Sequence, residues 1–267
     1  MIDPVALQIG PLAIRWYALA YIAGIVIGWR IARRLVEAAP RAATKEQVDD
    51  YVTWATLGII LGGRLGYVLF YRPGHYLQHP LEALMVWQGG MSFHGGALGV
   101  ILATWLFTRR HGLDPLRFGD RVAVVVPIGL FFGRLANFAN GELWGRATDV
   151  PWAMVFPHDP TGLPRHPSQL YQAGLEGIAL SALLWFLWWR TDARARTGTL
   201  TGALVAGYGV ARIIGEFFRQ PDANLGFLAG GATMGQLLSL PMVAAGLFLI
   251  LRARRGAGAP GGRRGAA

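Results

Sequence analysis

The chain has 267 residues, of which 53% are hydrophobic and 15% are charged. Soluble domains carry about 25% charged residues, so the composition indicates an integral membrane protein, and it makes nucleic-acid binding a poor explanation of the net charge of +10. The absence of cysteine excludes disulfides, thiolate metal sites and a cysteine nucleophile from this chain.

Seven apolar segments are long enough, some only loosely, to cross a bilayer as helices of roughly 20 residues. No basic region or small-residue cleavage site precedes the first segment, so we expect it to insert and to remain. A shorter apolar stretch, residues 81–90, predicts an interfacial or re-entrant piece. The seven segments are Ile14–Trp29, Tyr51–Tyr71, Ser92–Phe107, Val122–Ala139, Leu170–Trp189, Leu200–Phe218 and Met234–Leu251.

Basic residues are distributed unevenly between these segments. Seventeen lysines and arginines follow the first, third, fifth and seventh segments, and five lie on the opposite side. The positive-inside rule then predicts an outside N-terminus and a cytoplasmic C-terminus. The predicted fold is an all-α bundle of seven transmembrane helices that forms one catalytic domain, residues 1–251. A long outward loop, residues 140–169, contains five prolines and is predicted to be irregular.

Two further features follow from small residues. The tail, residues 252–267, is basic and glycine-rich, and we expect it to be disordered in the cytoplasm. Glycines recur every four residues in the second segment (Gly58, Gly62 and Gly66) and in the third (Gly95 and Gly99). This spacing predicts close packing between membrane helices.

The stretch 133–146, GRLANFANGELWGR, places several polar groups where a membrane helix ends. An ionisable residue at bilayer depth costs at least about 2.5–3.5 kcal/mol, so a partner, a cavity or a ligand must offset it. Arg134 and Asn137 share a helical face, but Arg134 has no acid three or four residues away. It therefore needs a partner from another segment or a bound anion. Glu142, just past the helix end, can orient Arg134, cap the helix or contact the ligand.

A polar stripe crosses the sixth segment, where Tyr208, Arg212 and Glu216 follow at intervals of four residues. Arg219 extends the stripe by three residues. Two interpretations remain open. The arginine and glutamate form an internal pair that neutralises itself, or they form a positive cavity wall in which Glu216 orients Arg212.

Two more polar residues lie near apolar runs. Arg64, in GGRLGY, is better explained by a structural role, although an anion contact is possible. His94, followed by two glycines, is either a hydrogen-bonded residue or a base, with the two readings evenly balanced. No metal-ligand spacing is visible, and no cofactor is expected. Together these residues predict an outward cavity for a phosphate, most simply that of a phospholipid.

Several motifs resemble those of the prolipoprotein diacylglyceryl transferases, from about Leu12 to Leu251. The block at 133–146 is highly specific to that family, and YGVARIIGEFFRQPD, residues 208–222, is nearly so. The HGG run at His94, RWYALAY at 15–21 and RHPSQLY at 165–171 also fit.

The resemblance implies an enzyme that moves the diacylglyceryl group of phosphatidylglycerol onto the lipobox cysteine of a preprolipoprotein. A thioether forms and glycerol-1-phosphate leaves. The resemblance also implies a bacterial inner-membrane protein whose site faces the outer leaflet. The only thiol at such a site would be that of the substrate, which gives the missing cysteines a meaning.

The resemblance assigns roles by position. It implies that Arg134 and Arg212 hold the phosphate and stabilise its departure, and that His94 matches the proposed base. Where the family often has glutamate after RHPSQLY, this chain has Gln172, which puts an acid role there in doubt. The expected catalytic residues are His94, Arg134, Arg212, Glu142 and Glu216, and the expected substrate-binding residues are Arg134, Asn137, Gly145, Arg212, Tyr17, Tyr208 and Arg64.

Two other classes of protein compete with the transferase. A phospholipid transporter or scramblase also buries charges in a helical bundle, but it predicts pseudo-repeated halves that this sequence lacks. An intramembrane protease or peptide-binding factor lacks a credible nucleophile, because no GxSxG motif is present.

Overall fold

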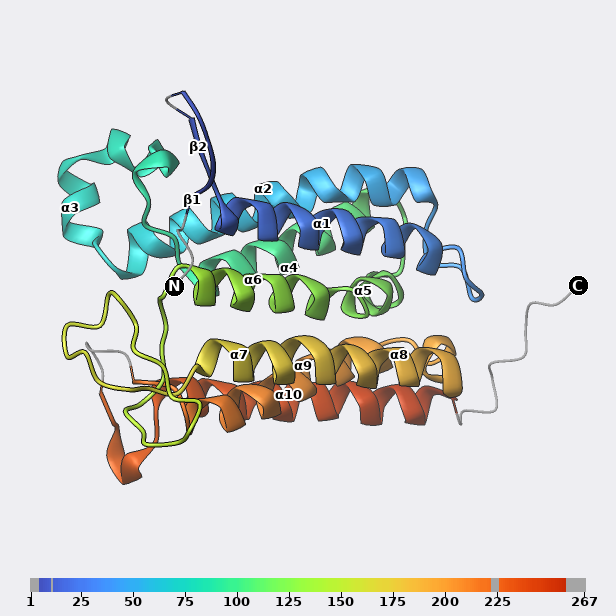
Figure 1. The fold of residues 1–267 in the computed structure, drawn as a ribbon. Coiled ribbons are helices and arrows are strands. Elements are labelled where there is room, and N and C mark those ends of the chain that lie inside the picture. Colours follow the sequence, from blue (N-terminus) through green and yellow to red (C-terminus); the bar gives the residue numbers. More distant parts are fainter. Residues whose placement is uncertain (1–4, 11, 222–225, 258–267) are drawn as a thin grey trace, which may run out of the picture. The chain divides into compact units, whose positions relative to one another are not determined.

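The computed structural model describes residues 5–10, 12–221 and 226–257, and most of them are helical (Figure 1). Among these residues, three helices are long and apolar enough to cross a membrane: Lys45–Phe70, Ser168–Arg190 and Met234–Arg255. Two helices bent by 44°, Pro115–Ala123 and Val126–Ala139, form a fourth candidate. The fold is therefore that of a helical membrane protein. Seven spans and their orientation stay predictions.

The chain divides into two compact units, one of residues 1–32 and 120–267 and the other of residues 33–119. In the first unit, α1 (Trp16–Leu35) packs against α6 (Val126–Ala139), since a Cβ added at Gly24 would lie 3.2 Å from Gly129 Cα. Each unit is described by itself below. The single domain at residues 1–251 stays a prediction.

One continuous helix of the first unit carries an irregular middle turn. It consists of α7 (Ser168–Gln172), the π-helix η3 (Ala173–Ala179) and α8 (Leu180–Arg190). Single π-turns inside α-helices occur frequently at functional sites. The short 3-10 helix η4 (Ala193–Ala195) then leads into α9.

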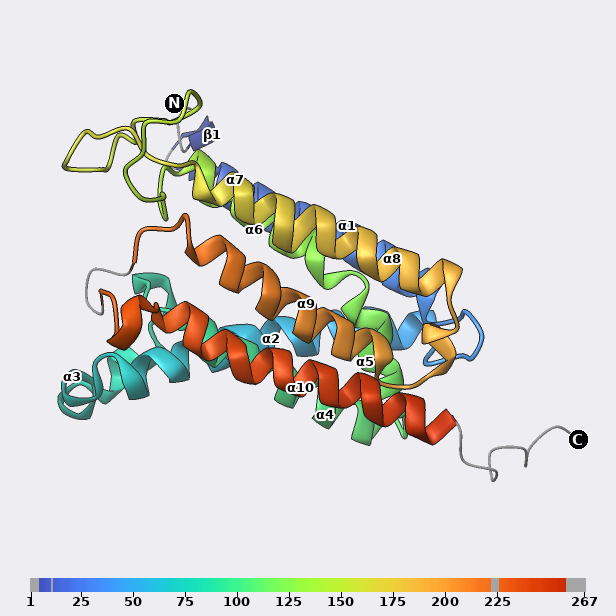
Figure 2. The ribbon, with the colours of Figure 1, turned by 90° about the horizontal axis from the view of Figure 1, so that it is seen from below.

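The first unit ends in a pair of helices. α9 (Thr199–Glu216) and α10 (Met234–Ala257) run side by side, and η5 (Ala229–Gly231) precedes α10 (Figure 2). Their backbones approach closely, because a Cβ at Gly202 would lie 2.6 Å from the carbonyl oxygen of Gly246.

The second unit is built on α2 (Lys45–Phe70) and α4 (Phe93–Arg110). Thr44 starts α2 with a capping box, in which its hydroxyl and the Gln47 side chain satisfy each other's backbone N–H groups. A Cβ at Gly58 would lie 2.7 Å from the carbonyl oxygen of Gly99. The glycine spacing therefore serves close helix packing, as predicted.

The segment between α2 and α4 is a chain of short helices: α3 (Pro73–Gln78), η1 (Pro80–Leu84) and η2 (Val86–Gln88). Leu77, Leu81 and Trp87 are exposed along it. Exposed apolar side chains on short helices fit the predicted interfacial piece, which stays a prediction.

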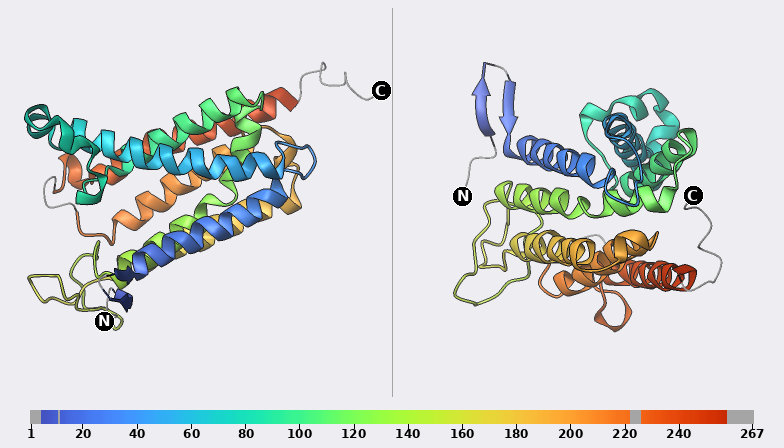
Figure 3. Two further views of the ribbon diagram at one scale, coloured as in Figure 1. Left: turned by 90° about the horizontal axis from the view of Figure 1, so that it is seen from above. Right: turned by 90° about the vertical axis from the view of Figure 1, so that its right-hand side faces the viewer.

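Three local predictions were wrong. Residues before α1 form an antiparallel hairpin of β1 (Val5–Ile9) and β2 (Leu12–Arg15), so the first helix starts after Ile14 (Figure 3, right). The predicted helix Val122–Ala139 is broken between α5 (Pro115–Ala123) and α6. Pro127 lies in the first turn of α6, where its missing N–H and fixed φ favour a helix start.

The third error concerns the tail. α10 continues through Leu251 to Ala257, so the start of the predicted disordered tail is helical. Residues 258–267 lie outside the described part of the chain. The outward loop, by contrast, is non-helical between α6 and α7, as its prolines predicted.

Candidate active site

The polar side chains of α9 form one network with the segment before α10. Arg212 pairs with Glu216 (Nη2 to Oε1, 2.6 Å), and Arg219 donates to the same oxygen at 3.2 Å. Thr233 Oγ1 donates to the other oxygen, Oε2, at 2.7 Å. Spacing of four and three residues on a helix brings these groups together, and a buried carboxylate needs such partners. Glu216 therefore orients Arg212 while both arginines compensate its charge.

Arg134 of α6 finds its partner on η3. Its Nε and Nη2 both lie 2.8 Å from Oε2 of Glu176, whose side chain is completely buried. Of the two possibilities for Arg134, a partner from another segment or a bound anion, the structure shows the first. Glu176 was missed in the sequence, although an acid inside the apolar run 170–189 is a signal that something pairs with it.

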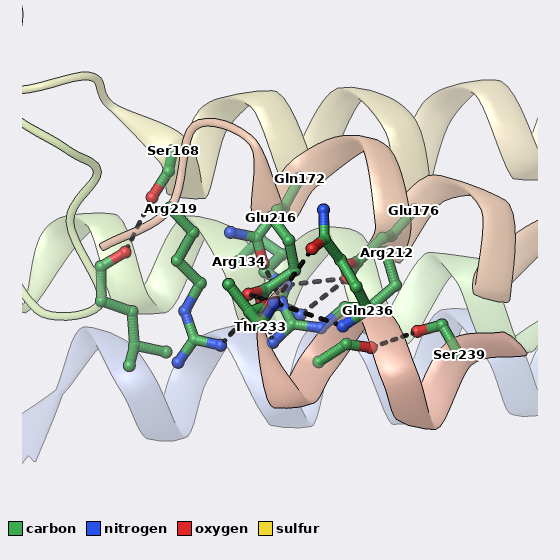
Figure 4. Close-up of polar contacts among 12 residues, drawn as sticks. Arg134, Ser168, Gln172, Glu176, Arg212, Glu216, Arg219, Thr233, Gln236 and Ser239 are labelled. Carbon is green, nitrogen blue, oxygen red and sulfur yellow. Dashed lines mark hydrogen bonds and ion pairs between the residues drawn. The ribbon is translucent and has the colours of Figure 1, made fainter. Parts of the chain in front are cut away.

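Gln172 gives Arg212 a second partner. Its Oε1 accepts a hydrogen bond from Arg212 Nη1 at 3.2 Å, and its side chain is buried on α7 one turn before Glu176. We refer to Arg134, Gln172, Glu176, Arg212, Glu216 and Arg219 as the arginine cluster. Figure 4 shows its side chains converging from α6, the α7–η3 helix and α9.

The arginine cluster has an excess of positive charge, because three guanidinium groups face two carboxylates. The side chains of Arg134 and Arg212 keep 15% and 14% of their surface exposed, while those of Glu176 and Glu216 are buried. The buried carboxylates thus hold the arginines in place, and the arginines are the part of the cluster that a ligand can reach. Guanidinium groups held in this way suit a phosphate, which accepts their parallel N–H donors.

The end of α6 is closed by a local contact. Asn137 Nδ2 donates to Glu142 Oε1 at 2.8 Å, and the Glu142 N–H donates to the carbonyl of Asn137 at 3.1 Å. Of the three roles considered for Glu142, this geometry favours that of closing the helix end. Among the described residues, its side chain makes no hydrogen bond or ion pair with Arg134.

The polypeptide beyond Glu142 is anchored to the end of α9. Gly145 donates its N–H to the carbonyl of His166, and Arg146 donates to the carbonyls of Arg219 and Glu216. A Cβ at Gly145 would lie 2.6 Å from both His166 Cβ and the carbonyl oxygen of Phe218. Gly145 therefore permits a close approach of two backbones that holds the loop against α9.

Two tyrosines belong to the same unit. The hydroxyl of Tyr17, on α1, forms a 3.1 Å hydrogen bond with the hydroxyl of Tyr21. Tyr17 is also close enough to Glu142 and Arg134 to interact with them electrostatically. Tyr208 on α9 lies within electrostatic range of Glu176, Arg134 and Arg212. Both predicted tyrosines thus accompany the arginine cluster.

His94 and Arg64 belong to the second unit, and the arginine cluster is described without them. His94 is exposed near the start of α4, with its ring against Phe93. Arg64 is buried and donates to the carbonyls of Glu82, Ala83, Gly89 and Gly90. This pattern gives Arg64 the structural role that the sequence favoured, since it ties the short helices after α2 to that helix.

The outward loop has an ion pair of its own. Asp159 accepts hydrogen bonds from Arg165 and Thr161, and the Arg165 guanidinium holds the pKa of Asp159 at about 2. Arg165 also donates to the carbonyl of Gly145, so this pair fixes the loop behind the end of α6. No group of three His, Asp or Glu side chains that could hold a metal is found in the described part of the chain.

Comparison with known proteins places these residues in a family. The family model described as prolipoprotein diacylglyceryl transferase matches residues 4–252. A relative from Paramagnetospirillum magneticum, named phosphatidylglycerol–prolipoprotein diacylglyceryl transferase, is 64% identical over 96% of each chain. A relative of the same name from Azospirillum brasilense is 60% identical over 95% of each chain. A third, from Rhodospirillum centenum, is 56% identical over 94% of this chain and 92% of its own. The chain therefore belongs to the prolipoprotein diacylglyceryl transferase family.

Proposed function

We propose that this enzyme transfers the diacylglyceryl group of phosphatidylglycerol to the thiol of the lipobox cysteine in a preprolipoprotein. The observation that carries the proposal is the arginine cluster, in which Arg134 and Arg212 are anchored by buried partners and keep an accessible face. The relatives' name supplies the substrates. The cluster supplies a chemical reason for them, since the lipid phosphate is the group that two fixed guanidinium groups recognise.

The reaction is a displacement at carbon. The cysteine sulfur attacks the glyceryl carbon that bears the phosphodiester oxygen, an S–C bond forms and that C–O bond breaks. The electron pair leaves with the oxygen as glycerol-1-phosphate, and the thiol proton passes to a base or to the departing phosphate. The products are a thioether and a phosphate monoester, whose additional negative charge develops in the transition state.

Arg134 and Arg212 stabilise this developing charge. Preorganised donors are effective because they need no reorientation during the reaction. Glu176 holds two nitrogens of Arg134, and Glu216 with Gln172 holds two of Arg212, so each arginine enters the reaction already oriented. A free thiol with a pKa of about 8.5 is only a few per cent ionised at neutral pH, and the same positive field favours its thiolate.

His94 is the alternative source of thiolate, as a general base worth about 10²–10⁴-fold. We propose that the arginines matter more. Glu142, Glu216, Asn137 and Gly145 shape the site, and Tyr17 and Tyr208 contact the lipid. Arg64 is the substrate-binding candidate with the least support, because its guanidinium already serves four carbonyls.

We place the enzyme in the bacterial inner membrane with seven spans, an outside N-terminus and a site toward the outer leaflet. The basic residues after alternate segments support this orientation. In this orientation the outward loop and the arginine end of α9 lie at the level of the outer headgroups, where both substrates are found.

One assay tests the function. Purified protein is mixed with phosphatidylglycerol labelled in its acyl chains and a lipobox peptide, with a Cys→Ser peptide as control. We expect label to move to the cysteine peptide alone and glycerol-1-phosphate to appear in equal amount. Flipping of lipid in vesicles without any transfer would instead support the transporter.

The same assay ranks the residues. We expect Arg134→Ala and Arg212→Ala each to lower kcat by about 10²–10³-fold, the usual cost of removing an oxyanion donor. His94→Asn should lower it less. An inactive histidine variant beside two arginine variants of near-normal rate would overturn this ranking.

A further inference from the structure

A stripe of three buried polar side chains, Gln169, Gln172 and Glu176, follows the helix formed by α7 and η3. Their spacing of three and seven residues places them on one helical face, and all three are at most 1% exposed. Each has one polar atom without a hydrogen-bond partner in the described part of the chain: Oε1 of Gln169, Nε2 of Gln172 and Oε1 of Glu176. Such atoms are rare in buried positions, because leaving them unpaired is unfavourable.

The partners of these side chains determine which polar atom of each has no hydrogen bond in the described part of the chain. Arg212 can only donate, so Gln172 must turn its Oε1 to that guanidinium and leave its amide N–H groups free. The carbonyl of Glu142 can only accept, so Gln169 gives it Nε2 at 2.6 Å and leaves Oε1. Glu176 uses Oε2 for Arg134 and leaves Oε1. The stripe therefore offers two acceptors and one donor.

We infer that this stripe recognises the two hydroxyl groups of the glycerol head group and so sets the enzyme's choice of lipid. The inference rests on the proposed function. Two hydroxyls provide two O–H donors, for Gln169 Oε1 and Glu176 Oε1, and an oxygen that accepts from Gln172 Nε2. All three unpaired atoms are then satisfied, while the attached phosphate lies against Arg134 and Arg212.

Other common head groups do not complement the stripe. An ammonium group has donors and no acceptor, so it would leave the amide of Gln172 unpaired and would add a cation beside two arginines. The arginines keep 15% and 14% side-chain exposure while the stripe has almost none. The head group thus meets the arginines before it meets the stripe.

Bound water is the competing occupant, since buried waters commonly satisfy such atoms. The two explanations differ in selectivity. If the stripe only holds water, its removal slows transfer from every lipid equally. If the stripe recognises hydroxyls, its removal slows transfer from a hydroxyl-bearing lipid most.

The test compares phosphatidylglycerol with phosphatidylpropanol, which has the same phosphate and a three-carbon head without hydroxyls. We measure kcat and KM for transfer to a lipobox peptide by the full-length protein and by Gln172→Met and Gln169→Met. The unchanged protein should prefer phosphatidylglycerol by about 10-fold or more, and each variant should lose about 5-fold of that preference, as expected for one hydrogen bond.

Thr199→Val is the matched control. Its hydroxyl is also buried and has no hydrogen-bond partner among the residues that the structure describes, but it lies at the other end of α9, about 20 Å from Arg212 at 1.5 Å per residue. This variant should keep the full preference. Equal slowing of both lipids by the two glutamine variants would overturn the inference and leave the transferase intact.

A measurement on the unchanged protein covers the case in which a glutamine variant does not fold. Glycerol-1-phosphate should inhibit transfer about 10-fold more strongly than propyl phosphate, since only the former carries the hydroxyls. Equal inhibition would overturn the inference. If the unchanged protein transferred neither lipid, the proposed function itself would fail.

Discussion

Glu176 determines how firmly Arg134 is held, because a single carboxylate oxygen takes two of its nitrogens. Glu176→Gln keeps the shape and one acceptor but removes the charge. We expect kcat to fall about 100-fold, since Arg134 loses its orientation, and the melting temperature to fall, since a buried charge loses its partner. Glu37→Gln, at a half-exposed pair with Lys45, should change neither. A normal kcat in the Glu176 variant would show that Arg134 does not need this partner.

Asp159 makes the outward loop sensitive to acid. Its pKa is about 2 beside Arg165, against about 3.9 in an unfolded chain. Because the folded pKa is the lower one, the pair stabilises the protein fully above about pH 4 and loses this contribution as pH falls toward 2. The melting temperature of purified protein should therefore exceed that of Asp159→Asn at pH 6, and the difference should shrink at pH 3. A difference that does not depend on pH would contradict this assignment.

The sequence predicted the pair of Arg212 and Glu216 but missed the partner of Arg134, for a physical reason. Arg212 and Glu216 are four residues apart, so helical geometry alone brings them together. Arg134 and Glu176 are neighbours only because α6 packs against η3, and no spacing rule contains that contact. The sequence showed that Arg134 needs a partner, but only the folded chain identifies it.

Among the structural elements, the turn at Gly145 is the one most constrained by packing. We expect Gly145→Ala to lower activity at least about 10-fold and to lower the melting temperature, because the new Cβ would lie 2.6 Å from backbone and side-chain atoms of His166. Gly174→Ala is the control: that helical glycine has open space around it and gains helix propensity worth about 1 kcal/mol. Equal behaviour of the two variants would argue against the close approach.

The boundaries of the elements show where hydropathy fails. Long apolar runs located α9 within two residues at each end, whereas α2 begins six residues before its predicted segment and α10 ends six residues after its own. The same signal joined the last two residues of α5 to α6, since the run is continuous and only Pro127 marks the new start. It also hid β1 and β2, because their residues continue the apolar pattern of the first helix. Hydropathy detects burial in lipid but does not detect a bend.

At the scale of the whole molecule, the orientation of the chain in the membrane decides on which side the arginine cluster lies. The cluster lies near the end of α9 that is joined to the outward loop. α8 ends at Arg190, and Arg194 and Arg196 follow it in the chain. The positive-inside rule predicts that these arginines lie in the cytoplasm, so in the proposed orientation the arginine cluster lies toward the outside.

This orientation can be measured directly, because the chain has no cysteine of its own. Asp149 in the outward loop and Asp192 after α8 are both exposed. In cells, Asp149→Cys should react with a membrane-impermeant maleimide added outside, and Asp192→Cys should react only after the membrane is opened. Both variants keep the arginine cluster, so transfer activity confirms that each labelled protein is folded. Labelling in the reverse order would place the arginine cluster toward the cytoplasm, where the thiol of a translocated precursor cannot reach it.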